Sequence, residues 1–151
     1  MISINPYLNF NGNTEEAFHF YKSVFGGEFI TLQRFKDTPE GDKLPLSDQD
    51  KIMHIALPLG SGTILMATDV LESMGQTLNP GNNFSISIDT QSKEEAEKYY
   101  HRLSEGGIIE MPLEDAFWGA YFGMFSDKFG IQWMINYDYN AQNNPNQSNI
   151  S

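Results

Sequence analysis

The sequence predicts an α+β protein made of two tandem βαβββ modules, each with a strand, a helix and three further strands. Two observations support this prediction. A helix pattern at residues 13–27 recurs at residues 92–107, and each copy has one strand pattern before it and three after it. A repeated supersecondary unit indicates duplication, so we expect a pocket or a dimer with approximate twofold symmetry.

The first strand pattern lies at residues 3–10. Its apolar side chains, Ile4 among them, alternate with the polar side chains of Asn5, Tyr7 and Asn9. Neighbouring side chains of a strand point to opposite faces. We therefore expect the apolar side to face a helix and the polar side to face away from it.

The helix patterns match residue by residue. Four residues recur at one spacing (94 − 15 = 79): Glu15, Glu16, Ala17 and Tyr21 become Glu94, Glu95, Ala96 and Tyr100. In both copies apolar residues fall at i, i+3, i+4 and i+7, on one helix face. Capping-box pairs, Asn13 with Glu16 and Ser92 with Glu95, predict where the helices begin, and paired glycines predict where they end. The alternative is two unrelated amphipathic helices.

The first module is expected to span residues 1–69. Its remaining strand patterns lie at 28–35, 51–59 and 63–68, and Gly60-Ser61-Gly62 joins the last two as a hairpin. Residues 36–50 form a charged segment with two prolines, which we expect to be a lid or a mobile loop.

The second module is expected to span residues 83–139, after a linker at 70–82. It repeats the order, with strand patterns at 83–89, 108–113, 121–126 and 131–136. We expect residues 1–139 to form one domain. Residues 140–151 are polar without periodicity, which predicts a flexible tail.

Composition limits the partners. The chain has 9 basic and 20 acidic residues, and its formal net charge of −11 disfavours nucleic acid and anionic membranes. It has no cysteine, which excludes thiol catalysis and cysteine-bound zinc. The sequence shows no secretory signal and no run long enough to cross a membrane. We therefore expect a cytoplasmic protein.

Three stretches carry a resemblance to a known family: P-Y-L-N-F-N-G-N-T-E-E-A-F-H-F-Y-K-S-V-F-G-G at 6–27, M-H-I at 53–55 and W-G-A-Y-F-G-M-F-S-D-K-F-G-I-Q-W at 118–133. The chain resembles the PhnB-like family of the vicinal-oxygen-chelate superfamily, alongside glyoxalase I, extradiol dioxygenases and bleomycin-resistance proteins. The resemblance implies curved mixed sheets around a cup, the glyoxalase/bleomycin-resistance-like fold, usually within a homodimer. Some relatives are labelled ubiquinone-pathway methyltransferases, but the chain has no glycine-rich strand-to-helix loop for a nucleotide-like cofactor.

The resemblance also implies where a metal would bind. Metal-dependent members of the superfamily take one ligand from the first strand and one from the last strand of each module. An alignment that matches Leu8 with Ile86 and Gly62 with Gly130 places four residues there: Asn5, Met66, Asn83 and Met134. Neutral amides and thioethers are poor ligands for Mg²⁺, Mn²⁺ or Zn²⁺. We therefore expect no bound metal and no other cofactor.

A cup without a metal would bind through uncharged groups. The candidate ligand-binding residues are Tyr7, Asn9, His54, Ser85, Ser87, Trp118, Tyr121 and Trp133. His54 is the one histidine on an expected strand, so it is a candidate general base or a hydrogen-bonding residue, and the alternative is a structural sheet histidine. The aromatic residues can form walls of the cup, or they can belong to the core.

Three hypotheses for function remain. The first is a protein that binds a small organic molecule in a metal-free aromatic cup. The second is an enzyme of the same superfamily, a lyase, isomerase or dioxygenase, using His54 or a metal held in another way. The third is a structural or regulatory dimer whose cup is filled by its own side chains.

Overall fold

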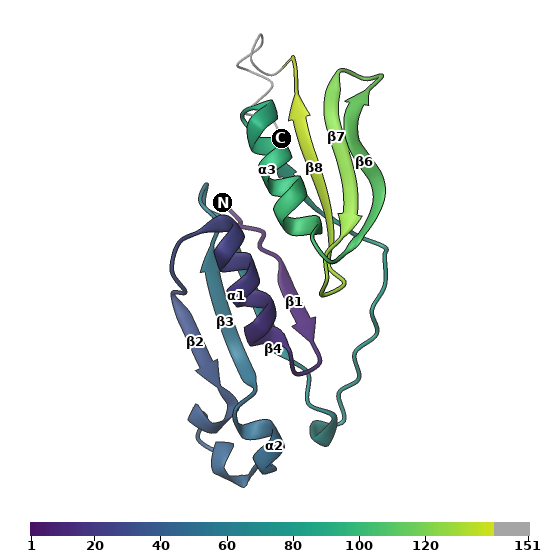
Figure 1. The fold of residues 1–151 in the computed structure, drawn as a ribbon. Coiled ribbons are helices and arrows are strands. Elements are labelled where there is room, and N and C mark those ends of the chain that lie inside the picture. The colour runs from purple at the N-terminus through teal and green to yellow at the C-terminus, as the bar shows by residue number, and fades with distance from the viewer. Residues whose placement is uncertain (141–151) are drawn as a thin grey trace. The chain divides into compact units, whose positions relative to one another are not determined.

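The computed structural model describes residues 1–140. The chain divides into two compact units, Met1–Asn79 and Pro80–Ser151, and each contains a four-stranded mixed sheet with one long helix over one face (Figure 1). Short helical turns aside, both have the predicted order of one strand, one long helix and three strands. Among the described residues, no helix has the length and apolar character needed to span a bilayer.

The first unit begins with β1 (Tyr7–Phe10) and α1 (Thr14–Phe25), followed by β2 (Thr31–Arg34), β3 (Ile52–Pro58) and β4 (Ile64–Asp69). The strand order is β1-β4-β3-β2, in which β1 is parallel to β4 and the other pairs are antiparallel. The predicted hairpin between β3 and β4 is confirmed, because all three of its residues adopt positive φ angles of 80°, 50° and 83°.

The charged segment after β2 is more ordered than the prediction of a loop. It contains η1 (Phe35–Asp37), η2 (Gly41–Lys43) and α2 (Leu46–Gln49). Gly41 is buried, and a Cβ atom added there would lie 2.2 Å from the Phe35 carbonyl oxygen. The segment therefore folds back on itself, with glycine at the point of closest approach.

The second unit has β5 (Ile86–Asp89), α3 (Lys93–Ser104), β6 (Ile108–Ala116), β7 (Ala120–Ser126) and β8 (Gln132–Asp138). Its strand order, β5-β8-β7-β6, repeats the order of the first unit. The expected linker is divided between the units, because residues 70–79, which include η3 (Glu72–Met74), belong to the first. Of the expected tail, residues 141–151 lie outside the described residues.

The two helices begin in different ways. Ser92 caps α3 as predicted, because its Oγ accepts a hydrogen bond from the Glu95 N–H at 3.1 Å. The capping box predicted for α1 is wrong, since the Asn13 side chain makes no cap hydrogen bond. Asp69, at the end of β4, replaces it: its Oδ1 accepts hydrogen bonds from the Thr14 N–H at 3.1 Å and the Thr14 hydroxyl at 2.6 Å.

Each long helix packs on its sheet through aromatic side chains. Phe18 of α1 meets Phe10 of β1 edge-on, with ring centroids 6.4 Å apart. Tyr100 of α3 meets Phe125 of β7 in the same way at 5.7 Å. These contacts define the covered face of each sheet, and the other face is called the open face below. The prediction that Ile4 packs on this side is wrong, because the strand begins only at Tyr7 and Ile4 is 84% exposed.

Candidate functional site

The open face of the first sheet carries three of the predicted ligand-binding residues, Tyr7, Asn9 and His54. Tyr7 and Asn9 alternate with Leu8 and Phe10, which are buried on the covered face. Residues directly opposite each other in a ladder share a face, so the pairing of Tyr7 with Met66 places Met66 on the open face as well.

Tyr7 and His54 meet above β4, which lies between β1 and β3. The Tyr7 hydroxyl is 3.0 Å from His54 Nδ1, and the two rings stack with centroids 5.6 Å apart and planes inclined by 23°. Burial raises the pKa of the Tyr7 hydroxyl above its usual range, so the phenol keeps its proton at neutral pH. Whether the hydroxyl donates or accepts depends on the His54 tautomer, and this contact uses only the Nδ1 atom of the ring.

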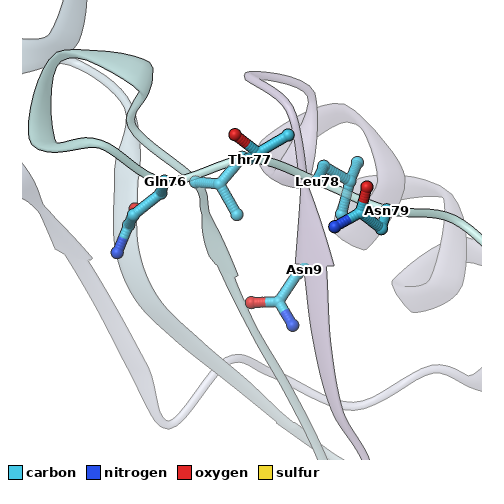
Figure 2. A pocket seen from close by; sticks show the side chains of 6 residues that line it. Asn9, Gln76, Thr77, Leu78 and Asn79 are labelled. Atoms are coloured by element: carbon cyan, nitrogen blue, oxygen red, sulfur yellow. The ribbon is translucent and has the colours of Figure 1, made fainter.

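A pocket of about 400 Å³ adjoins this pair at Asn9. Figure 2 shows Asn9 on β1 facing the chain segment that carries Gln76, Thr77, Leu78 and Asn79, and Val70 completes the lining. Sequence reasoning missed this wall because residues 70–82 lack periodicity and are typical of a linker. The available signal was three polar side chains close together, Gln76, Thr77 and Asn79.

The segment from Val70 to Asn79, called the strap below, is held in place by hydrogen bonds. The Val70 N–H donates to the Phe10 carbonyl at 2.8 Å, and the Leu71 N–H donates to Gln76 Oε1 at 2.7 Å. The Ser73 hydroxyl donates to Asp48 Oδ2 at 2.6 Å. This hydrogen bond, together with Lys51, lowers the pKa of the Asp48 carboxyl, so Asp48 is ionised at neutral pH.

The open face of the second sheet carries a row of methionines among polar side chains such as Asn136 and Asp89. Ladder pairs join Met111 to Met124, Met124 to Met134 and Met134 to Ser87. Trp118, which is 52% exposed, lies edge-on to Phe122 with ring centroids 5.7 Å apart. The predicted residues Ser87 and Trp118 therefore lie on this uncovered side. Ser85 precedes β5 and contacts Gln132 Oε1 through its hydroxyl at 3.5 Å.

Two of the aromatic residues predicted to line a cup lie on the covered face instead. Trp133 is fully buried, and its Nε1–H donates to Asp127 Oδ2 at 2.8 Å. The Tyr121 hydroxyl donates to Glu97 of α3 at 3.1 Å, and Lys93 lies over the Tyr121 ring. The side chains of Trp133 and Tyr121 therefore lie on the helix side of the sheet, and we remove both residues from the candidate site.

The four superfamily metal positions can be placed by the strand ladders. The β3–β4 and β7–β8 hairpins match at one spacing (134 − 66 = 68; 126 − 58 = 68), which makes Met66 and Met134 equivalent. Met66 pairs with Tyr7 and Met134 with Ser87. The sequence alignment of β1 with β5 is therefore off by two residues, and Asn5 and Asn83 both precede their strands.

Neither version of these positions suits a divalent cation. Asn5 Oδ1 already accepts a hydrogen bond from the Ile64 N–H at 2.8 Å. Thioethers, a protonated phenol and a serine hydroxyl provide no charge to balance a dication. Within residues 1–140, no group of three or more His, Cys, Asp or Glu side chains is arranged to hold a metal ion. We derive no chemistry through a metal.

Comparison with known proteins identifies the family. A family model described as 3-demethylubiquinone-9 3-methyltransferase matches residues 2–136. The chain belongs to this family, the PhnB-like proteins. Protein YjdN of Escherichia coli K12 is 31% identical over 141 residues, which cover 88% of this chain and 93% of YjdN.

Solved structures of PhnB-like and related proteins support the fold. Protein PA1353 from Pseudomonas aeruginosa is 42% identical with a TM-score of 0.80, covering 91% of this chain and 98% of that one. A putative 3-demethylubiquinone-9 3-methyltransferase, PhnB protein, from Bacillus cereus is 27% identical with a TM-score of 0.71, covering 90% and 99%. A glyoxalase/bleomycin resistance protein from Albidiferax ferrireducens T118, 14% identical over 88% of this chain and 95% of its own, shares the fold with a TM-score of 0.61. The predicted fold class and the PhnB-like family are confirmed.

Proposed function

We propose that this PhnB-like protein binds a small uncharged organic molecule on the open face of its first sheet. The observation that carries this proposal is the contact of Tyr7 with His54, 3.0 Å between hydroxyl and Nδ1, beside a pocket that begins at Asn9. A pocket of about 400 Å³ falls within the usual size range of small-ligand sites.

The chemistry of this face favours binding by hydrogen bonds and apolar contact. The Tyr7 phenol is protonated at neutral pH and burial raises its pKa further, so it can hydrogen-bond without a charge to desolvate. Met66, its ladder partner, adds a polarizable and adaptable apolar surface. On the second unit, Ser85, Ser87 and Trp118 are proposed as ligand contacts of their own, separate from this site.

The description of the family names a methyltransferase, which requires a site for a methyl-donor cofactor. In nucleotide-binding α/β folds, phosphates often bind at a glycine-rich turn between a strand and the helix that follows it. The corresponding turn in this protein joins β1 to α1. Here that turn has the single glycine Gly12, and the Gly12 N–H donates to Asp69 at 3.0 Å. We therefore propose binding without methyl transfer.

We also propose a cytoplasmic protein that forms a homodimer through its exposed apolar edge residues Leu32 and Ile108.

A screen of small organic fragments tests the binding proposal. We expect fragments that bind to shift the methyl resonance of Met66 in protein labelled with ¹³C at the methionine methyl groups. Tyr7→Phe should weaken those fragments about three- to tenfold, because one hydrogen bond contributes about 0.5–1.5 kcal/mol. Tyr139→Phe is the matched control, since its hydroxyl donates to Asp115 instead. Fragments that bind equally well to the Tyr7 variant, without moving Met66, would refute this site.

Metal content is a separate prediction. We expect protein dialysed after purification to retain far less than one equivalent of Mn, Ni or Zn, because burying a dication without carboxylates is costly. Elemental analysis measures this directly. Stoichiometric metal that is lost in Met66→Ala would contradict the reasoning from the donor set. Metal lost in His54→Ala instead would favour the enzyme hypothesis.

A further inference from the structure

The lining of the pocket beside β1 is polar but uncharged. Three of its six lining residues carry carboxamides, Asn9, Gln76 and Asn79, and a fourth, Thr77, carries a hydroxyl. We propose that this pocket binds a planar, uncharged head group with both a hydrogen-bond donor and an acceptor, as in a primary amide, a lactam or a ureide. This inference rests on the proposed function and names the class of ligand for the same site.

Carboxamides suit such a head group because each one both donates and accepts. Figure 2 shows Asn9 on β1 and Gln76, Thr77 and Asn79 on the strap, so the polar lining comes from two segments of the chain. Gln76 is oriented by its own hydrogen bond: its Oε1 accepts from the Leu71 N–H at 2.7 Å. The Gln76 carbonyl oxygen is therefore hydrogen-bonded within the strap, and the Gln76 NH₂ group can donate to a ligand. The Gln76 end of the pocket therefore favours an acceptor on the ligand.

Charged head groups are disfavoured because no ionisable side chain lines the pocket. Two acids that contact this part of the chain, Asp69 and Asp48, already have partners. Asp69, next to Val70, is buried and accepts hydrogen bonds from Gly12, Thr14 and Ile52. Asp48 is bound to Ser73 and Lys51. A charged ligand would lose hydration without gaining an ion pair, and the net charge of −11 adds repulsion for anions.

The Tyr7–His54 pair lies next to Asn9 along β1, outside the six residues that line the pocket. Asn9 and Tyr7 are two residues apart on one strand, so their side chains stand side by side on the open face. With its head group in the pocket, the ligand is proposed to extend its body along β1 toward Tyr7. The structure assigns a ligand with an amide-like end and an apolar or aromatic body.

Three probes of nearly one shape but different charge test the inference: benzamide is neutral, benzoate is an anion and benzamidine is a cation at neutral pH. We expect benzamide to bind at least about tenfold more tightly than benzoate, the ratio that corresponds to about 1.4 kcal/mol. Benzamide should also shift the side-chain NH₂ resonances of Asn9, Gln76 and Asn79 in ¹⁵N-labelled protein. Equal affinity for benzamide and benzoate, or shifts confined to other residues, would overturn the inference.

An Asn9→Asp variant tests the pocket by changing its preference. It removes a donor and adds a negative charge, so benzamide should weaken at least about fivefold while benzamidine gains affinity. Ser23→Asp is the matched control, because it adds the same charge on the exposed side of α1, which covers the opposite face of the same sheet. An equal gain of benzamidine affinity in the control would show general electrostatic attraction and overturn the inference. Unchanged dispersion of the amide spectrum confirms that each variant is folded.

The failure of this inference can be told apart from failure of the proposed function. If benzamide shows no preference but other fragments still shift Met66 and depend on Tyr7, the binding proposal stands and the ligand class is wrong. If no fragment shifts Met66, both are wrong.

Discussion

Replacing Asp69 by alanine is expected to lower the free energy of unfolding of the first unit by about 3–5 kcal/mol. Asp69 is 2% exposed, and its carboxylate accepts hydrogen bonds from the N–H groups of Gly12, Thr14 and Ile52 and from the Thr14 hydroxyl. These donors belong to the start of α1 and the start of β3, so a single side chain joins helix and sheet. Its removal leaves buried donors without an acceptor, and it removes the negative charge at the helix N-terminus.

Urea unfolding measures the loss, and hydrogen exchange at the amides of α1 locates it. Ser92→Ala is the control, because it removes a local helix cap and should cost only about 1 kcal/mol. The loss for Asp69→Asn should fall between the losses for Asp69→Ala and Ser92→Ala, since an amide keeps one acceptor oxygen. A loss for Asp69→Ala no larger than that for Ser92→Ala would show that the carboxylate does not join the two elements.

Trp133→Ala is expected to destabilise the second unit by about 3–5 kcal/mol, the usual cost of truncating a large buried aromatic side chain. Trp133 is fully buried on the covered face of β8, and its Nε1–H donates to Asp127 Oδ2 at 2.8 Å. Asp127 also accepts hydrogen bonds from the N–H groups of Phe129 and Ile131, which shape the β7–β8 turn. The substitution therefore opens a cavity and loosens the turn together.

Trp118→Ala provides the comparison, because the chain has two tryptophans and Trp118 is 52% exposed. We expect a loss below about 1 kcal/mol for Trp118→Ala in urea unfolding, in line with substitutions of exposed residues. Similar losses for the two variants would mean that Trp133 is not a core residue, and would return it to the wall of a ligand site. If Trp133→Ala does not fold, Trp133→Phe gives a smaller loss in the same direction.

The repeat in the sequence predicted most of the fold. Both long helices lie at the expected positions, because their apolar stripes and closing glycines are local signals. The cap of α1 could not be predicted in this way. Its acceptor, Asp69, lies 55 residues after Thr14, and nothing in the local pattern distinguishes it from other acids at the ends of strands.

The candidate site was predicted in part. Alternation placed Tyr7 and Asn9 on the open face, and in the structure His54 lies against Tyr7. Trp133 was misplaced although the sequence held the contrary signal: Met134 was assigned to the ligand side, and adjacent residues of a strand point to opposite faces. The strap was missed for a physical reason, since its position depends on Ser73 reaching Asp48, a contact between two segments without regular pattern.

The different caps of α1 and α3 also set the order in which the helices can be completed during folding. The Ser92 cap is three residues from its donor, so α3 can gain it while the rest of its unit is still unfolded. The start of α1 must wait until β4 is in place, because its acceptor is 55 residues away and the intervening chain must first close a loop. The cap contacts of the two helices thus differ in sequence separation. We expect mutations at Ser92 to change the folding rate, and mutations at Asp69 to change mainly the unfolding rate.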